Sequence, residues 1–213
     1  MKKPLVLGIL FILPLVIYLF FASGVNRFGR LPVLTDSFAS ETVLLTSEKE
    51  AMDLFQNKIT VLSFLGEEVE LMKGYLFNFN QKIYKRFYEF NDFQTLLVVY
   101  PNQKVAVEQL LLELGQITDT SRYKVLYLDE SDSVKLFDAL KSKGELNSGS
   151  SPLVYIIDKN GSLRGRTDDE DEGILYGYDI RSVAVLNNKM EDDVKVLLAE
   201  YRLALKKNYA DRK

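Results

Sequence analysis

Residues 152–166 decide the fold class, and they read Pro-Leu-Val-Tyr-Ile-Ile-Asp-Lys-Asn-Gly-Ser-Leu-Arg-Gly-Arg. The apolar run from Leu153 to Ile157 is rich in β-branched and aromatic residues and ends at polar ones, which is typical of a buried strand. The pair Asn160-Gly161 predicts a type I′ turn, because both residues tolerate the positive φ that this turn requires. Residues 162–167 are therefore expected to return antiparallel to the strand.

Three similar apolar runs precede this hairpin, at 59–65, 95–100 and 123–128. Helical patterns lie between the runs, at 69–90, 105–117 and 133–143. A last helix, at 182–206, carries one apolar stripe of Leu186, Met190, Val194, Leu197, Tyr201 and Leu205. Strands that alternate with helices predict βαβ units, and thus an α/β fold with a layered sheet.

The N-terminus has 20 consecutive residues without a charge, from Pro4 to Ser23. A helix of this length spans about 30 Å, the thickness of a bilayer's hydrocarbon core. We expect a cytoplasmic head at 1–3, a single transmembrane anchor at 4–23, and a tether at 24–45. The soluble domain, 46–208, would then lie on the extracytoplasmic, periplasmic side, followed by a tail at 209–213.

A cleavable signal peptide is the alternative interpretation of the same segment. Lys2 and Lys3 would form its basic head, and Ala22-Ser23-Gly24 is small enough for cleavage. The apolar run is longer than the usual core of such a peptide, which favours the anchor. The sequence leaves both possibilities open.

Composition limits the chemistry. The chain of 213 residues has no cysteine and no histidine, so neither a thiol couple nor an imidazole base is present. It carries 27 basic and 30 acidic residues and a formal charge of −3, which gives no electrostatic footprint for nucleic acid. We therefore predict no catalytic residue, no cofactor and no nucleic-acid partner.

The stretch 152–166 resembles the closing hairpin of thioredoxin-like proteins, and with the long helix at 187–206 and the anchor and tether it is similar to the Sco/SenC copper-chaperone family. The resemblance implies a thioredoxin-like mixed sheet flanked by helices. It also implies Cys-x-x-x-Cys after the first core strand and a histidine before the hairpin, as soft copper ligands. A cis proline often precedes this hairpin strand in thioredoxin-like proteins, and the Ser151–Pro152 bond is open to either isomer.

None of these ligands is present. The segment after the first core strand reads Gly66-Glu-Glu-Val-Glu-Leu-Met72, and the histidine position falls near Ser150. The positions near Glu67, Glu70, Leu71 and Ser150 thus form a degenerate site, with no metal predicted. Substitute ligation would require Glu67, Glu70 or a methionine to converge near Ser150, whereas acids near a helix N-terminus also simply favour its dipole.

The helix at 69–90 has two apolar faces. The expected core stripe consists of Leu76, Phe79, Ile83, Phe87 and Phe90. The second face, Phe77, Tyr84 and Tyr88, either packs under the tether or a neighbouring helix or forms a surface for a protein partner.

Two other groups have simpler interpretations. The acidic run at 168–172 lacks the ligand spacing of a calcium-binding loop and is expected to be a solvated loop after the hairpin. Met52, Met72 and Met190 lie on separate predicted helices and are expected to fill the core.

Three functions are compatible with these patterns. The first is a membrane-anchored, catalytically silent domain that binds another protein as an assembly factor in the cell envelope, with respiratory-oxidase assembly implied by the resemblance. The second is a metallochaperone or redox protein with substitute ligands, and the third is a purely structural envelope protein.

Overall fold

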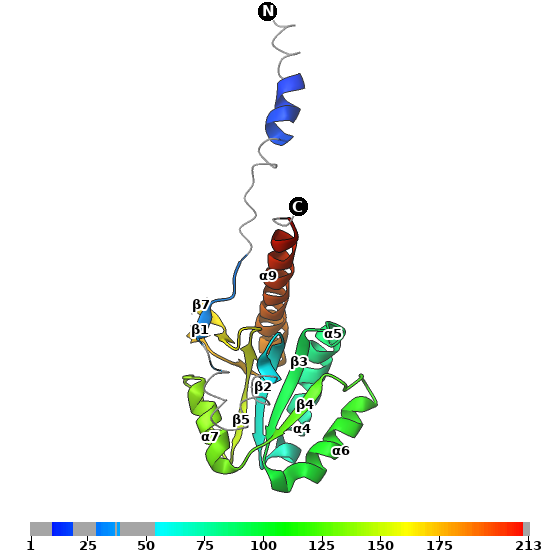
Figure 1. Cartoon of the computed structure of the whole chain (residues 1–213), viewed down its shortest axis with the longest axis vertical. Coiled ribbons are helices and arrows are strands. Elements are labelled where there is room, and N and C mark those ends of the chain that lie inside the picture. The colour runs from blue at the N-terminus through cyan, green and yellow to red at the C-terminus, as the bar shows by residue number, and fades with distance from the viewer. Residues whose placement is uncertain (1–9, 19–28, 37, 39–53, 211–213) are drawn as a thin grey trace, which may run out of the picture.

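The computed structural model describes residues 10–18, 29–36, 38 and 54–210, without the side chains of 205–210. The main sheet has the strand order β1-β6-β5-β2-β3-β4, and β9 also pairs with β5 (Figure 1). These strands are β1 Val33–Thr35, β2 Ile59–Gly66, β3 Phe93–Val99, β4 Tyr123–Tyr127, β5 Ser150–Ile157, β6 Leu163–Arg164 and β9 Tyr178–Asp179. A separate hairpin joins β7 Arg166–Asp169 to β8 Gly173–Leu175.

Helices cover both faces of the sheet. Alternation along β2 sends Ile59 and Val61 to one face and Leu62 and Phe64 to the other, which creates two cores. The first core lies under α4 Val69–Phe79, α6 Lys104–Gly115 and the long C-terminal helix, which consists of α8 Val183–Val185, a π-helical turn Leu186–Met190 and α9 Glu191–Ala210. The second lies under α7 Glu130–Ala139, with Phe38 and Phe55 completing it.

The strand directions define a thioredoxin-like fold. β2, α4 and β3 form a parallel βαβ unit, and β5, β6 and α9 form an antiparallel ββα unit, with β2 and β5 adjacent and antiparallel at the centre. The units α6, β4 and α7 connect the two halves, with β4 parallel to β3. This confirms the α/β class and the mixed sheet flanked by helices that the sequence predicts.

Several local predictions differ from the structure. The stretch 24–45, expected to be a tether, contains β1, which pairs with β6 at the edge of the main sheet. The hairpin turn is not type I′, because only Gly161 of the pair has positive φ, at 75°. Asp158 and Ser162 instead close a three-residue loop in which Gly161 takes the left-handed position, and the Asp158 carboxylate accepts hydrogen bonds from the N–H groups of Asn160 and Ser162.

The helix predicted at 69–90 is continuous but not uniform. α4 passes through a π-helical turn, Asn80–Tyr84, into the short α5, Lys85–Phe87. The turn places the buried amide of Asn80 between Thr118 and the hydroxyl of Tyr123. Phe90 lies beyond the helix and is 49% exposed, so it does not belong to the core stripe in which it was expected.

The N-terminal predictions are only partly within the described residues. Residues 10–18 are helical, and the rest of the predicted anchor lies outside the described residues. Within the described part of the chain, we find no helix that combines the length and the apolar character needed to cross a membrane. The Ser151–Pro152 bond is trans, so the cis proline seen in many thioredoxin-like proteins is absent at this position.

Candidate functional site

Two of the positions predicted for the degenerate site, Glu67 and Ser150, lie near each other at the carboxyl edge of β2. Leu65 pairs with Ser150 across β2 and β5, and the Glu67 N–H donates to the Ser148 carbonyl at 3.1 Å. Gly66 has a φ of +50°, and a Cβ there would overlap the backbone of Ser148 and Gly149. The loop before β5 is thus packed directly on the end of β2, and the edge is closed by backbone contacts.

The side chains at this edge do not form a ligand set. Glu70 and Leu71 point to solvent, with Leu71 66% exposed, and Glu67 is exposed as well, whereas Ser150 is buried. Met72 and Met190 are buried in the first core, as expected, and Met52 lies outside the described residues. Among the residues that the structure describes, no group of three or more carboxylates could hold a metal ion.

Tyr100 lies beneath the same closed edge. Its N–H donates to the Gly66 carbonyl at 3.1 Å, and its hydroxyl is in such close proximity to Gly149 that a Cβ at that glycine would overlap it. The hydroxyl is buried and has no hydrogen-bond partner among the described residues. Burial, and secondarily the charges of Glu130 and Glu67, raise the pKa of Tyr100, so this phenol remains neutral.

The predicted partner face of Phe77, Tyr84 and Tyr88 does not form a single exposed surface. Tyr84 is completely buried, stacks on Tyr123 with ring centroids 4.1 Å apart, and donates to the Asp119 carbonyl at 2.7 Å. Burial raises the pKa of Tyr84 to about 12. Phe77 and Tyr88 are half-buried against the first core. Tyr84 is therefore a core residue, because the chain leading into β4 covers this face of the helix.

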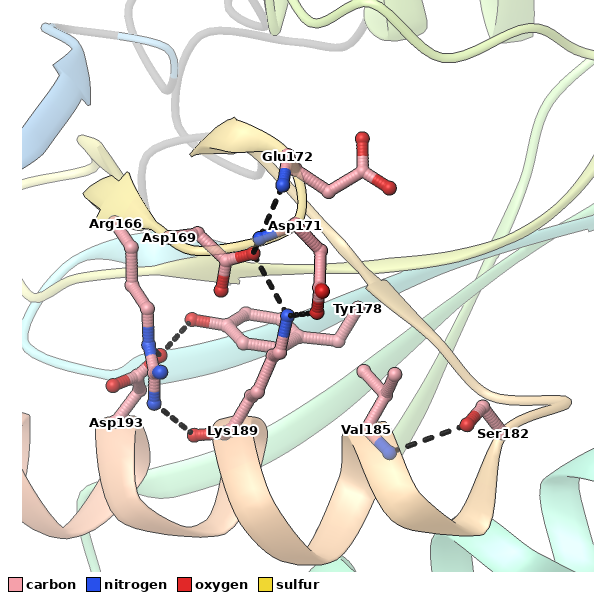
Figure 2. Close-up of polar contacts among 9 residues, drawn as sticks. All are labelled: Arg166, Asp169, Asp171, Glu172, Tyr178, Ser182, Val185, Lys189 and Asp193. Carbon is pink, nitrogen blue, oxygen red and sulfur yellow. Dashed lines mark hydrogen bonds and ion pairs between the residues drawn. The ribbon is translucent and has the colours of Figure 1, made fainter.

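A polar cluster that the sequence patterns did not predict lies between the β7–β8 hairpin and the start of the C-terminal helix (Figure 2). Its anionic centre is Asp193 in α9, whose side chain is 8% exposed. The Asp193 carboxylate accepts from Nε of Arg166 at 2.7 Å and from the Tyr178 hydroxyl at 2.6 Å. Arg166 also donates to the Lys189 carbonyl at 3.1 Å, in the π-helical turn.

Lys189 forms the second half of the cluster. Its ammonium lies between two carboxylates of the hairpin, at 2.8 Å from Asp169 and 2.7 Å from Asp171 (Figure 2). Asp169 is 1% exposed at its side chain and also accepts from the N–H groups of Asp171 and Glu172, which fixes the turn. The acidic run at 168–172 is therefore exposed, as expected, except at Asp169, which is buried and anchored to the helix.

Two cavities border this cluster. One, of about 420 Å³, has Arg30, Leu31, Arg166, Asp168, Lys189 and Asp193 among its lining residues. The other, of about 410 Å³, is bordered by Lys143, Leu153, Asp171, Ile174, Arg181 and Lys189, among others. Both volumes are in the range of pockets that hold a small molecule or a side chain. Lys189 and Asp171 line both cavities and lie between them.

The charges of the cluster are fixed around neutral pH. The ammonium of Lys189 lowers the pKa of Asp169, and Asp169, followed by Asp171, raises the pKa of Lys189. Asp193 raises the pKa of Arg166, while burial, together with Asp193, raises the pKa of Tyr178 well above its ordinary value. Efficient proton transfer requires a pKa near the working pH, so these groups are suited to holding the structure and presenting charge.

One sequence signal could have revealed the cluster. Asp193 falls within the apolar stripe of the last helix, between Met190 and Leu197 at helical spacing. A carboxylate on a core-facing stripe requires a buried cationic or hydrogen-bonding partner. The identity of the partner, Arg166, could not be predicted, because it depends on how the hairpin folds over the helix.

Comparison with known proteins adds little to these findings. No family model matches the chain, and no curated protein matches it. A solved structure of the yeast mitochondrial 1-Cys peroxiredoxin is 14% identical, with a TM-score of 0.34, over 53% of this chain and 55% of that chain. The chain thus spans about half the length of that protein, and a match at this level carries no argument. The fold assignment rests on the strand order, and this chain has no cysteine for thiol chemistry.

Proposed function

We propose that this protein is a membrane-anchored, catalytically silent thioredoxin-like domain that binds another protein in the cell envelope. The observation that carries the proposal is the closed edge at Gly66, where the backbone of Ser148 and Gly149 occupies the space that a side chain at position 66 would need. A thioredoxin-like domain whose β2 edge is closed by backbone atoms still keeps its strands and helices. Its outer surfaces therefore remain able to bind another protein.

The proposed anchor is supported by its composition and by its described part. Pro4 to Ser23 carries no charge, and the helix at 10–18 exposes eight large apolar side chains. A surface of this kind is unfavourable in water and favourable in lipid. The domain would lie on the extracytoplasmic side of the membrane, with residues 1–3 on the cytoplasmic side.

The proposed class of partner comes from the resemblance. As a degenerate relative of the Sco/SenC family, the protein would act as an assembly factor, with respiratory-oxidase assembly as the leading process. It would do so by contact alone, since its sequence has neither thiol nor imidazole to carry copper.

Site-directed photo-crosslinking in native membranes tests the binding role. A photoreactive amino acid replaces Leu71, which is exposed beside the closed edge, and in a matched variant it replaces Phe90, which is 49% exposed after α5. We expect a reproducible crosslinked protein from position 71 that position 90 does not yield. Recovery of the same abundant envelope proteins from both positions would contradict specific binding at this edge.

Copper titration tests the alternative of a metallochaperone. The full chain in detergent, titrated with Cu(I) and Cu(II) against a competing chelator, is expected to leave the metal with the chelator. Stoichiometric binding that Glu67→Gln and Glu70→Gln abolish would overturn the non-metal assignment.

Extraction of membranes at alkaline pH tests the anchor, because an integral protein stays in the pellet.

A further inference from the structure

The chain has a marked charge asymmetry that net charge conceals. Residues 32–200 carry 18 basic and 29 acidic side chains, a net charge of −11. The stretches 24–31 and 201–213 carry only one acid, Asp211. Their basic residues are Arg27, Arg30, Arg202, Lys206, Lys207, Arg212 and Lys213. The two ends of the soluble part are therefore cationic, while the domain between them is strongly anionic.

A single buried arginine brings these two cationic stretches together. Arg164 is 6% exposed, donates from Nε to the Leu31 carbonyl at 2.8 Å, and forms an ion pair with Glu200 of α9 at 2.7 Å. The chain therefore enters the domain beside the point at which the last part of α9 begins. In Figure 1, α9 extends past the sheet on the side from which residues 29–32 enter.

The packing of α9 on the core becomes thinner at this point, where, among the described side chains, only Leu198 and Tyr201 still contact the first core, half-buried. Leu197 is the last residue of the helix that is completely buried, and none of the residues from Leu198 to Ala204 is buried in the same way. From Glu200, the helix continues to Ala210 over about 15 Å. Beyond Tyr201 the described helix has little packing, and a helical extension of this kind has marginal stability in water, so a further contact would stabilise it.

We infer that the C-terminal end of α9 docks on anionic lipid headgroups. The inference rests on the proposed anchor. Eight residue steps from Ser23 to Leu31 span at most about 29 Å, so the end of α9 lies within reach of the membrane surface. Lys and Arg near an anionic surface are attracted to it, whereas the acidic domain is repelled and turns away.

Hydrogen exchange of the full chain in lipid nanodiscs tests this docking. One set of nanodiscs contains only zwitterionic phosphatidylcholine, and the other also contains anionic phosphatidylglycerol. We expect the amides of 201–210 to exchange roughly tenfold more slowly on the anionic discs, with β2 unchanged. The difference should disappear in about 0.5 M salt, because headgroup attraction is screened.

Charge reversal supplies the matched variants. The double change Lys206→Glu and Lys207→Glu should abolish the difference between the two lipids, whereas Lys104→Glu with Lys124→Glu, on exposed positions of α6 and β4, should leave it. Far-UV circular dichroism checks that each variant is folded. Equal protection of 201–210 on both lipids would overturn the docking.

The same preparations separate this inference from the proposed anchor. If the anchor exists, the wild-type chain and the charge-reversal variant both remain bound to neutral vesicles in a flotation gradient. A chain that floats on neutral vesicles but shows no lipid-dependent protection retains its anchor and refutes the docking. A chain that does not float on neutral vesicles refutes the anchor, and the docking that rests on it falls as well.

Discussion

The Tyr178 hydroxyl donates a hydrogen bond of 2.6 Å to the Asp193 carboxylate, which connects the end of the sheet to the C-terminal helix. The same carboxylate neutralises Arg166 of the β7–β8 hairpin. One aspartate therefore holds three elements together. Its removal leaves the partly buried Arg166 without its ion-pair partner and the buried Tyr178 hydroxyl without its hydrogen-bond acceptor.

Asp193→Ala is accordingly expected to lower the free energy of unfolding by about 3 kcal/mol, the typical cost of breaking a buried charge pair. Asp192→Ala is the matched control, since its side chain is 61% exposed, and a change within about 0.5 kcal/mol is expected. Urea unfolding of the full chain in detergent, followed by circular dichroism, measures both. Equal effects of the two changes would mean that the buried network adds nothing to stability.

Acid is expected to release the β7–β8 hairpin before the main sheet unfolds. Lys189 lowers the pKa of Asp169, so the stabilisation is fully present above the ordinary aspartate pKa of about 3.9 and is lost as pH falls through the lower folded value. The pKa of Lys189 is raised, so its contribution persists until pH rises above the ordinary lysine range. Between these limits the contact does not respond to pH.

Hydrogen-exchange protection of residues 166–175, corrected for intrinsic rates, measures this release. Asp169→Asn should weaken protection at neutral pH and remove its acid dependence, while Asp168→Asn, at an exposed position, should preserve both. An unchanged acid dependence in Asp169→Asn would assign the effect to another group.

Gly149→Ala tests the closed edge. Gly149 has a φ of +72°, and a Cβ there would overlap the Tyr100 side chain, so strain and overpacking together should cost about 3 kcal/mol of unfolding free energy. Gly173→Ala is the matched control, because Gly173 has a similar φ of +69° but the space around it is open. We expect this change to lower the free energy of unfolding by about 1 kcal/mol. Similar costs at both glycines would show that the edge is looser than the contact indicates.

Removal of two tyrosine hydroxyls should have opposite effects. Tyr100→Phe deletes a buried hydroxyl without a partner among the described residues, so the free energy of unfolding should stay the same or rise by up to about 1 kcal/mol. Tyr84→Phe loses the hydrogen bonds with the Asp119 carbonyl and the Arg122 N–H, so this change should lower the free energy of unfolding by about 1–2 kcal/mol. Thermal unfolding compares the two variants, and destabilisation by Tyr100→Phe would reveal a hydrogen bond at that hydroxyl.

The sequence by itself determined the order of the core strands β2 to β6 and of the helices from Ile59 onward, but not the β7–β8 hairpin or β9. Continuous apolar runs and helical stripes are local patterns, because they depend only on the spacing of apolar residues along the sequence. The absence of cysteine and histidine was likewise readable from the chain.

Only the tertiary structure decided which side chains are covered and which charges meet. Tyr84 belonged to a second apolar face in the sequence, but the chain leading into β4 buries it. Arg166 and Asp193 are 27 residues apart, and Asp169 and Lys189 are 20 apart, so no local period predicts their pairing. These contacts depend on how the hairpin lies on the last helix, because the pairing of distant charges is set by the fold as a whole.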